Sequence, residues 1–94
     1  MTYFVTATRK AGKKSVQEIS AYRISTTRTN DGKVMTKSQF FSEFYVESDA
    51  YFAYNSYTMQ TIGLERKFSV NGEPYLQSIA NGTESDNLLS LPEC

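Results

Sequence analysis

The hydrophobic and polar positions of this chain follow a strand-like pattern at its amino-terminal end. Residues 2–9 are rich in β-branched and aromatic side chains, and Tyr3, Val5 and Ala7 would lie on one face of an extended strand. Residues 16–27 continue the pattern, but its phase changes near Ala21, which indicates a β-bulge at that position. The two runs predict an N-terminal β-hairpin.

A helix signal follows the first hairpin in the sequence. Thr36 and Gln39 have the spacing of a capping box, in which the threonine side chain accepts an amide hydrogen bond and the glutamine bonds back to the cap residue. The phenylalanines at positions 40, 41 and 44 then form an apolar stripe. We expect one amphipathic helix from about Lys37 to about Glu47.

Strand-like segments occupy much of the second half of the sequence. Residues 50–57 favour β structure by their composition, whereas residues 58–63 have the character of a connection. From residue 64 to residue 70 apolar and polar side chains alternate, with Phe68 and Val70 on the apolar face. These segments predict two strands joined by an extended connection.

A second hairpin is predicted around residue 71. Asn71 and Gly72 both tolerate left-handed backbone geometry, which is typical of a type I′ turn. Residues 75–80 would form the returning strand. Because Pro74 has no backbone N–H, we expect this strand at an edge of the sheet.

A leucine-rich tail, residues 83–94, follows the last predicted strand. Thr83 or Ser85 would cap a short helical segment, and Pro92 would end it. The buried side of this tail would come from three leucines, Leu88, Leu89 and Leu91. We expect the tail to pack onto the sheet as a clamp.

The predicted elements indicate one domain over residues 1–94 in the α+β class. The fold would combine the N-terminal β-hairpin, one amphipathic helix and about three C-terminal strands in one mostly antiparallel sheet. No internal repeat and no linker composition divides the chain.

The final part of the sequence also carries the motif of a known family. The matching residues are Asn71-Gly72, Tyr75-Leu76, Asn81-Gly82-Thr83, Ser85-Asp86-Asn87-Leu88-Leu89 and Leu91-Pro92. This pattern resembles the C-terminal signature of a family of small bacterial and phage proteins known only as a domain of unknown function. The resemblance implies the predicted order of elements and a bacterial or phage setting, and it implies no activity. The aromatic stretch 40–57 and the connection 56–63 depart from the family pattern.

The residue types present exclude most catalytic and metal-binding chemistry. The chain has no histidine, which is the commonest general base and metal ligand. Its only cysteine, Cys94, cannot form an internal disulfide and has no imidazole to activate its thiol. We therefore expect a protein that is not an enzyme and that uses no cofactor and no metal. Without a signal sequence or a long apolar stretch, we also expect a cytoplasmic protein with no membrane partner.

Charge is divided between the two parts of the chain. Residues 1–37 carry eight basic and two acidic side chains, a net charge of +6, and residues 38–94 carry the reverse, a net charge of −6. The two parts would neutralise each other within one fold or attract other molecules. Self-association between opposite faces of two copies, weakened by salt, is one consequence to consider.

The main binding hypothesis concerns the aromatic and acidic stretch from Phe40 to Tyr57. It holds eight of the thirteen aromatic residues, more than one helix and one strand can bury, so several tyrosines would remain at the surface beside carboxylates. The expected contacts to a protein partner are Glu43, Tyr45, Glu47, Tyr51 and Tyr54. A phage protein that blocks a host enzyme or defence complex is one concrete version of this hypothesis. The opposing interpretation is that the tyrosines merely cover the edge of the core.

The alternative is a small nucleic-acid-binding protein. Its basic N-terminal hairpin would lie along a phosphate backbone. The expected contacts are Arg9, Lys10, Lys13, Lys14, Arg23 and Arg28. A net charge of zero for the chain argues against this alternative.

Overall fold

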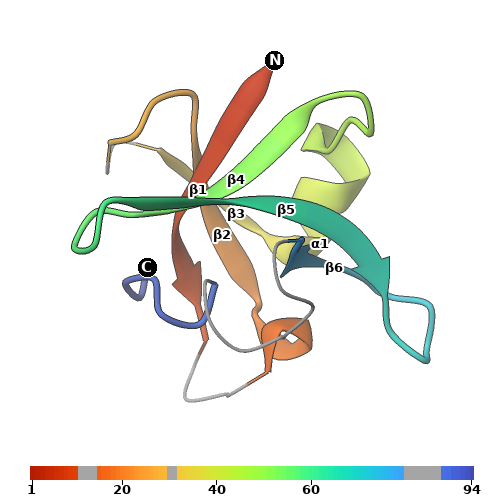
Figure 1. The fold of residues 1–94 in the computed structure, drawn as a ribbon. Helices are drawn as coiled ribbons and strands as arrows, with labels where there is room; N and C mark the ends of the chain where they lie inside the picture. Colours follow the sequence, from red (N-terminus) through yellow and green to blue (C-terminus); the bar gives the residue numbers. More distant parts are fainter. Residues whose placement is uncertain (11–14, 30–31, 80–87) are drawn as a thin grey trace.

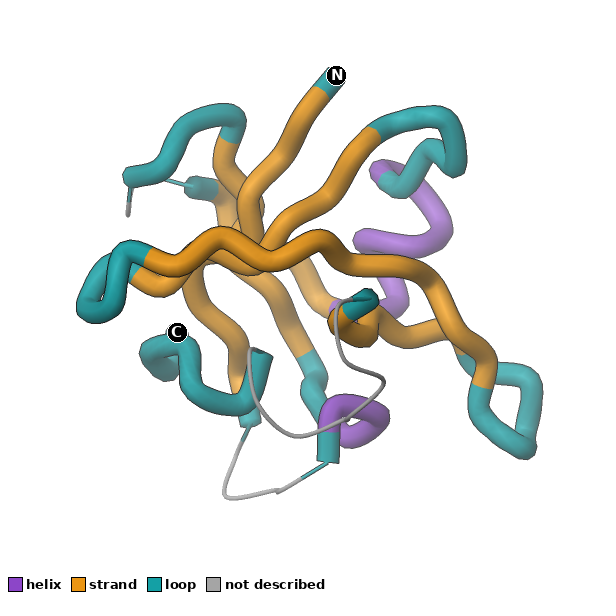
Figure 2. The backbone as a smooth tube through the Cα atoms, viewed as in Figure 1, coloured by secondary structure: helices purple, strands orange, loops and turns teal. Residues whose placement is uncertain are grey.

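A computed structural model describes residues 1–10, 15–29, 32–79 and 88–94 of the chain. These residues form a six-stranded sheet in the order β3-β2-β1-β4-β5-β6, with short helical segments against it (Figure 1). The elements are β1 (Thr2–Arg9), η1 (Val16–Glu18), β2 (Ala21–Ser25), β3 (Lys33–Thr36), α1 (Lys37–Gln39), η2 (Phe40–Phe44), β4 (Ala50–Asn55), β5 (Gln60–Phe68) and β6 (Pro74–Ser78). Figure 2 shows the strands crossing at the centre and the helical segments at the periphery.

The first strand lies at the centre of the sheet and is covered on both faces. Each residue from Phe4 to Thr8 is at most 8% exposed. Phe4 packs against Phe52 on one face, while Val5 belongs to the main core on the other. β1 pairs antiparallel with β2 but parallel with β4, which makes the sheet mixed. Burial on both faces explains why the residues from Phe4 to Thr8 are all apolar or hydroxylic.

The predicted N-terminal hairpin is present, but the predicted bulge is misplaced. The register of β1 and β2 shifts between Val5 and Ala7, within β1. The change of phase near Ala21 has a different cause, because η1 is a 3-10 turn that buries Val16 before β2 begins. A turn rather than a bulge therefore reorients the chain ahead of β2.

The predicted helix begins where the capping box places it and ends early. Thr36 is the N-cap, and its Oγ1 accepts a hydrogen bond from the N–H of Gln39 at 3.1 Å. α1 passes directly into η2, a π-helical turn in which the N–H of Tyr45 donates to the carbonyl of Phe40 at 2.7 Å. The backbone of Tyr45 is already extended, so the predicted continuation to Glu47 is wrong.

Two predictions in the second half also need correction. Residues 60–63 are not a connection, because β5 starts at Gln60 and pairs Gly63 with Phe52 of β4. The turn between β5 and β6 is a hairpin turn but not type I′, since Gly72 has a φ of +83° and Asn71 has no positive φ. Instead, the hydroxyl of Ser69 accepts hydrogen bonds from the N–H groups of Asn71 and Glu73.

The sheet curls so that β6 approaches β2. The hydroxyl of Tyr22 in β2 accepts a hydrogen bond from the N–H of Leu76 in β6 at 3.3 Å, and both residues are fully buried. β6 forms an outer strand of the sheet, as Pro74 predicted. The enclosed core contains Val5, Val16, Ile19, Tyr22, Ile24, Met35, Phe40, Tyr51, Ala53, Leu64, Tyr75, Leu76, Leu88 and Leu91.

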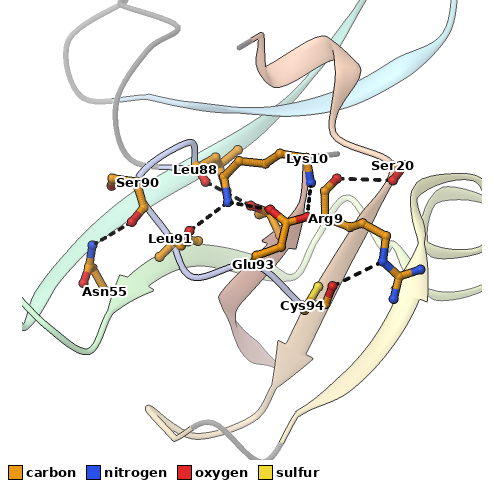
Figure 3. A network of polar contacts seen from close by, with 10 residues as sticks. Arg9, Lys10, Ser20, Asn55, Leu88, Ser90, Leu91, Glu93 and Cys94 are labelled. Carbon is orange, nitrogen blue, oxygen red and sulfur yellow. Dashed lines mark hydrogen bonds and ion pairs between the residues drawn. The ribbon is translucent and has the colours of Figure 1, made fainter. Parts of the chain in front are cut away.

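The C-terminal residues extend the sheet beside β1, where β4 no longer pairs with it (Figure 3). The N–H of Thr8 donates to the carbonyl of Pro92 at 3.0 Å, and the N–H of Cys94 donates to the carbonyl of Thr8 at 3.1 Å. The Nζ of Lys10 donates to the carbonyl of Leu91 at 2.7 Å. Leu88 and Leu91 are buried in the core, so the predicted packing of the tail is confirmed for the described residues. The proposed caps Thr83 and Ser85 lie outside them.

The predicted α+β class is wrong. The structure is mostly sheet, and within the described residues the helical content is limited to η1 and the joined segments α1 and η2. One short strand, β3, lies between the predicted hairpin and the predicted helix, where the sequence analysis assigned no strand. Among the described residues, no helix is both long enough and apolar enough to cross a membrane.

Candidate functional site

The aromatic residues of the stretch from Phe40 to Tyr57 mostly build an internal cluster. Seven rings from β1, β2, the helical segment and β4 contact one another with centroid separations of 4.8 to 6.4 Å. They are Tyr3, Tyr22, Phe40, Phe41, Phe44, Tyr45 and Tyr51. The π-helical turn contributes Phe40, Phe41 and Phe44 to this cluster.

Two of the predicted contact residues are buried. Tyr51 is 4% exposed and Tyr54 is 8% exposed, because β4 lies between β1 and β5 with both faces covered. The hydroxyl of Tyr51 accepts a hydrogen bond from the N–H of Val46 at 3.0 Å. Burial, only partly opposed by this bond, raises the pKa of Tyr51. Neither ring offers area to a partner in this arrangement.

The other three predicted contacts lie together at the surface. Glu43 and Glu47 are exposed, and Tyr45 is half-buried at the edge of the aromatic cluster. Glu47 Oε1 lies 3.2 Å from the Nη2 of Arg66, a residue of β5. The guanidinium of Arg66 also lies 5.0 Å from the centre of the Tyr45 ring.

The sequence pattern missed the importance of Arg66 and Phe68. Phe68 was assigned to the buried face of its strand, yet it is 57% exposed. The guanidinium of Arg66 lies 5.1 Å from the centre of the Phe68 ring, so it contacts both Phe68 and Tyr45. The available signal was their spacing, because residues two apart in a strand share a face.

A pocket of about 410 Å³ opens between the helical segment and the start of β6. Its lining residues are Lys37, Ser38, Phe41, Ser42, Glu73 and Pro74. Phe41 and Pro74 supply apolar walls, and Lys37 and Glu73 supply charges of opposite sign. The Nζ of Lys37 donates to the carbonyl of Gln17 at 2.6 Å, which fixes this side chain at the wall of the pocket.

The pocket and the arginine contacts belong to one surface. The ring of Phe41, in the pocket, lies 5.4 Å from the ring of Tyr45, which in turn lies under Arg66. Phe68 is paired with Pro74 in the register of β5 and β6. We call this surface the ring-and-pocket surface. It comprises Tyr45, Arg66 and Phe68 together with the six residues that line the pocket.

The basic residues of the nucleic-acid alternative fall in two places. Arg9 and Lys10 contact the tail: the Nε of Arg9 donates to the carbonyl of Cys94, and Lys10 Nζ lies 3.7 Å from Glu93 Oε1. Burial raises the pKa of the Cys94 thiol, and Arg9 partly opposes this effect. Lys13 and Lys14 lie outside the described residues.

Arg23 and Arg28 lie on the face of the sheet that carries Phe4. The Nε of Arg23 donates to Thr6 Oγ1 at 3.0 Å, and the guanidinium of Arg28 lies 4.8 Å from the centre of the Phe4 ring. The charge of Arg23 also lowers the pKa of the Cys94 thiol in part, so Arg23 lies within electrostatic reach of the tail network around Arg9 and Lys10. Nucleic-acid binding by this set stays a prediction.

Comparison with known proteins assigns the chain to a family. Residues 4–92 match the model of a family described as a protein of unknown function, DUF3892. The chain belongs to the DUF3892 family. The DUF3892 match runs from β1 to Pro92 and therefore includes the ring-and-pocket surface and most of the tail.

The family assignment agrees with the resemblance found in the sequence only at the level of a domain of unknown function. The part of the C-terminal signature that falls within residues 80–87 lies outside the described residues. Neither the curated proteins nor the solved structures include a match to this DUF3892 chain.

Proposed function

We propose that this DUF3892 protein is a non-catalytic protein-binding module that engages its partner through the ring-and-pocket surface. The observation that carries the proposal is the position of Arg66, whose guanidinium lies between the rings of Tyr45 and Phe68 beside an open pocket. Arginine and aromatic residues are enriched at the energetic centres of protein interfaces.

The physical basis is the low cost of ordering this surface. Arg66 is held by two rings and by Glu47, so binding would immobilise few additional rotatable bonds. Phe68 offers apolar area that is still in contact with water. A partner that covers Phe68 and inserts a side chain beside Phe41 would remove both apolar regions from solvent.

The carboxylates of Glu43 and Glu47 would surround this centre. Both are exposed, and Glu47 already balances Arg66. Charges at such a rim influence the rate of association and the choice of partner more than the final affinity. In this proposal Tyr51 supports the surface from inside through its ring contact with Tyr45, and Tyr54, on the opposite face of β4, takes no part in it.

A finer version places the protein in a bacterium or phage, in the cytoplasm, as an inhibitor of a host enzyme or defence complex. Its support is the sequence resemblance alone. The identity of the partner would decide between this version and other protein-binding roles.

A capture experiment tests the proposal. The full chain would be immobilised and exposed to bacterial lysate treated with nuclease, in parallel with a variant carrying Arg66→Ala and Phe68→Ser. A matched control would carry Tyr57→Ser and Met59→Ser, which change two exposed apolar residues on the β4–β5 hairpin at the other end of β5 (Figure 1).

We expect the first variant to lose the captured protein and the control to retain it. Loss of a central contact costs more than about 2 kcal/mol, or roughly 30-fold in affinity. The proposal is wrong if both variants capture equally, or if nuclease alone removes the partner from the unmodified chain.

A further inference from the structure

The two outer strands of the sheet differ in what their free backbone groups can bind. In β6, the N–H of Ile79 donates to Gly63, and the carbonyl of Glu73 accepts from Ser69. Odd-numbered residues of β6 therefore face β5, and Pro74, Leu76 and Ser78 face outward. Pro74 has no N–H, and the N–H of Leu76 already donates to Tyr22. This edge is poorly suited to accept another strand.

In the described part of the chain, no strand pairs with the outer edge of β3. The N–H and the carbonyl of Thr8 both bond to the C-terminal segment, so the backbone groups of Thr8 point away from β2. The residues on either side of Thr8 in β1 therefore bond to β2, where their partners are Ala21 and Arg23. Tyr22 and Ile24 of β2 consequently face β3, where their partners are Met35 and Lys33.

The remaining residues of β3, Val34 and Thr36, therefore direct their backbone groups away from the sheet. The side chain of Val34 is 40% exposed, and Thr36 is also exposed. Among the described residues, no backbone hydrogen bond outside the sheet involves Val34. An unpaired strand edge is a template for adding a strand from another chain.

The geometry points to strand addition: we propose that the edge of β3 binds an extended acidic segment of the protein partner, which places one apolar side chain in the adjacent pocket. This inference rests on the proposed protein-binding function and specifies how the partner is recognised. The backbone groups of Val34 and the N–H of Thr36 would pair with the segment, and the pocket would select the side chain at one end.

The pocket lies where the end of an added strand would reach it. Lys37 and Ser38, which follow β3 directly, form one side of the pocket, and Phe41 lies one turn further on. Neighbouring strands are about 4.8 Å apart, so a segment paired with β3 passes next to these residues. Phe41 and Pro74 provide the apolar walls that would accept an aromatic or aliphatic side chain.

Charge selects the occupant of the edge. Lys33 and Lys37 stand at its two ends, and Arg23 is the cross-strand neighbour of Val34. Alternating glutamates on an added segment would face Lys33 and Lys37, which share one face of the edge, whereas Arg23 lies on the opposite face with Val34. A second copy of this chain, paired through its own β3, would instead bring further lysines to the same edge, which is unfavourable.

A defined peptide tests the inference. The probe is a fluorescein-labelled octapeptide that alternates glutamate and valine and ends in tyrosine, and the measurement is fluorescence anisotropy with the full chain. A second peptide, with lysine in place of glutamate, tests the role of charge. We expect saturable binding of the acidic peptide only, with affinity that falls as salt is raised.

Two substitutions at one position isolate the backbone contact. Val34→Pro removes the outward N–H without touching the bonds to β2, whereas Val34→Thr keeps it and serves as the matched control. We expect at least a tenfold loss of affinity for Val34→Pro and less than a twofold change for Val34→Thr, with circular dichroism confirming that both variants fold. In the unmodified chain, hydrogen exchange at the amides of Val34 and Thr36 should slow when the peptide binds.

The outcomes separate this inference from the broader proposal. Absence of peptide binding at millimolar concentration, or equal binding by Val34→Pro and Val34→Thr, would overturn strand addition. If partner capture then still required Arg66 and Phe68, the protein-binding function would stand without this recognition mode. A third outcome is peptide binding that depends on Val34 together with partner capture that is unchanged by Arg66→Ala and Phe68→Ser. That outcome would support strand addition at β3 and would show that the ring-and-pocket surface is not the binding centre.

Discussion

At the scale of single residues, the hydroxyl of Tyr22 joins β2 to β6 in the curled sheet. Tyr22 supplies the acceptor for the otherwise unpaired N–H of Leu76, inside the core. Tyr22→Phe leaves that buried donor without a partner while keeping the ring in place. We expect the free energy of unfolding to fall by about 1–3 kcal/mol, measured by urea denaturation. An unchanged midpoint would show that water or a shift of β6 satisfies Leu76.

The same tyrosine predicts a dependence on alkaline pH. Burial raises the pKa of Tyr22 well above its ordinary value of 10.0, although the bond from Leu76 lowers it in part. Below pH 10 the folded and unfolded chains both keep the proton, so stability does not change. Above pH 10 the unfolded chain releases a proton that the folded chain retains, so stability falls as pH rises. Stability measured from pH 8 to pH 11.5 should therefore decline less steeply in Tyr22→Phe. Tyr51, whose pKa is also raised, should leave a residual slope.

At the scale of elements, Gly63 within β5 and Gly72 in the turn after β5 have different roles. A matched pair of alanine substitutions can separate them. Gly72 has a φ of +83° and open space around it, so the cost of Gly72→Ala comes from the backbone alone, about 1–2 kcal/mol. Gly63 has no such φ, and an added Cβ would lie 3.4 Å from the flexible Ile79 Cδ1. We expect Gly63→Ala to be neutral or stabilising by up to about 1 kcal/mol in thermal denaturation. Equal losses in the two variants would contradict this assignment.

The start of a helix or strand could be predicted from the sequence where nearby residues cause it. The ends of these elements and the pairing of the strands could not be predicted. The bond from Gln39 to Thr36 depends on residues three apart, and it forms where the capping box indicated. The end of the helical segment depends on the aromatic cluster, whose rings come from distant strands. β3 is four residues long and pairs only on one side, so its pattern is too short to identify.

The candidate site also combines residues that the sequence could predict with residues that it could not. Glu43, Tyr45 and Glu47 lie at the surface as expected from their composition, but Tyr51 and Tyr54 are buried by neighbours on both sides of β4. Whether β4 is a central strand depends on its parallel pairing with β1, which joins residues about fifty positions apart. Arg66 became part of the site for the same reason, since β5 brings it to Tyr45.

At the scale of the whole molecule, the two oppositely charged parts of the chain meet at the tail. Lys10 from the basic part contacts Glu93 from the acidic part, and the Lys10 Nζ also donates to the carbonyl of Leu91. Exposed ion pairs contribute little by themselves. The larger contribution of this junction is therefore apolar, from the leucines that the tail places in the core.

The tail completes the core between β1 and β4, so its leucines should contribute to global stability rather than to local order. Leu91 is 3% exposed within the core, whereas Leu89 is only partly buried against it. We expect Leu91→Ala to lower the free energy of unfolding by about 2–5 kcal/mol in urea denaturation, and the matched Leu89→Ala to cost clearly less. Because Thr8 at the centre of the sheet bonds to Pro92 and Cys94, Leu91→Ala should also speed hydrogen exchange at the amide of Thr8. Loss of tail order without any change in the global unfolding midpoint would show instead that the sheet closes its core without these residues.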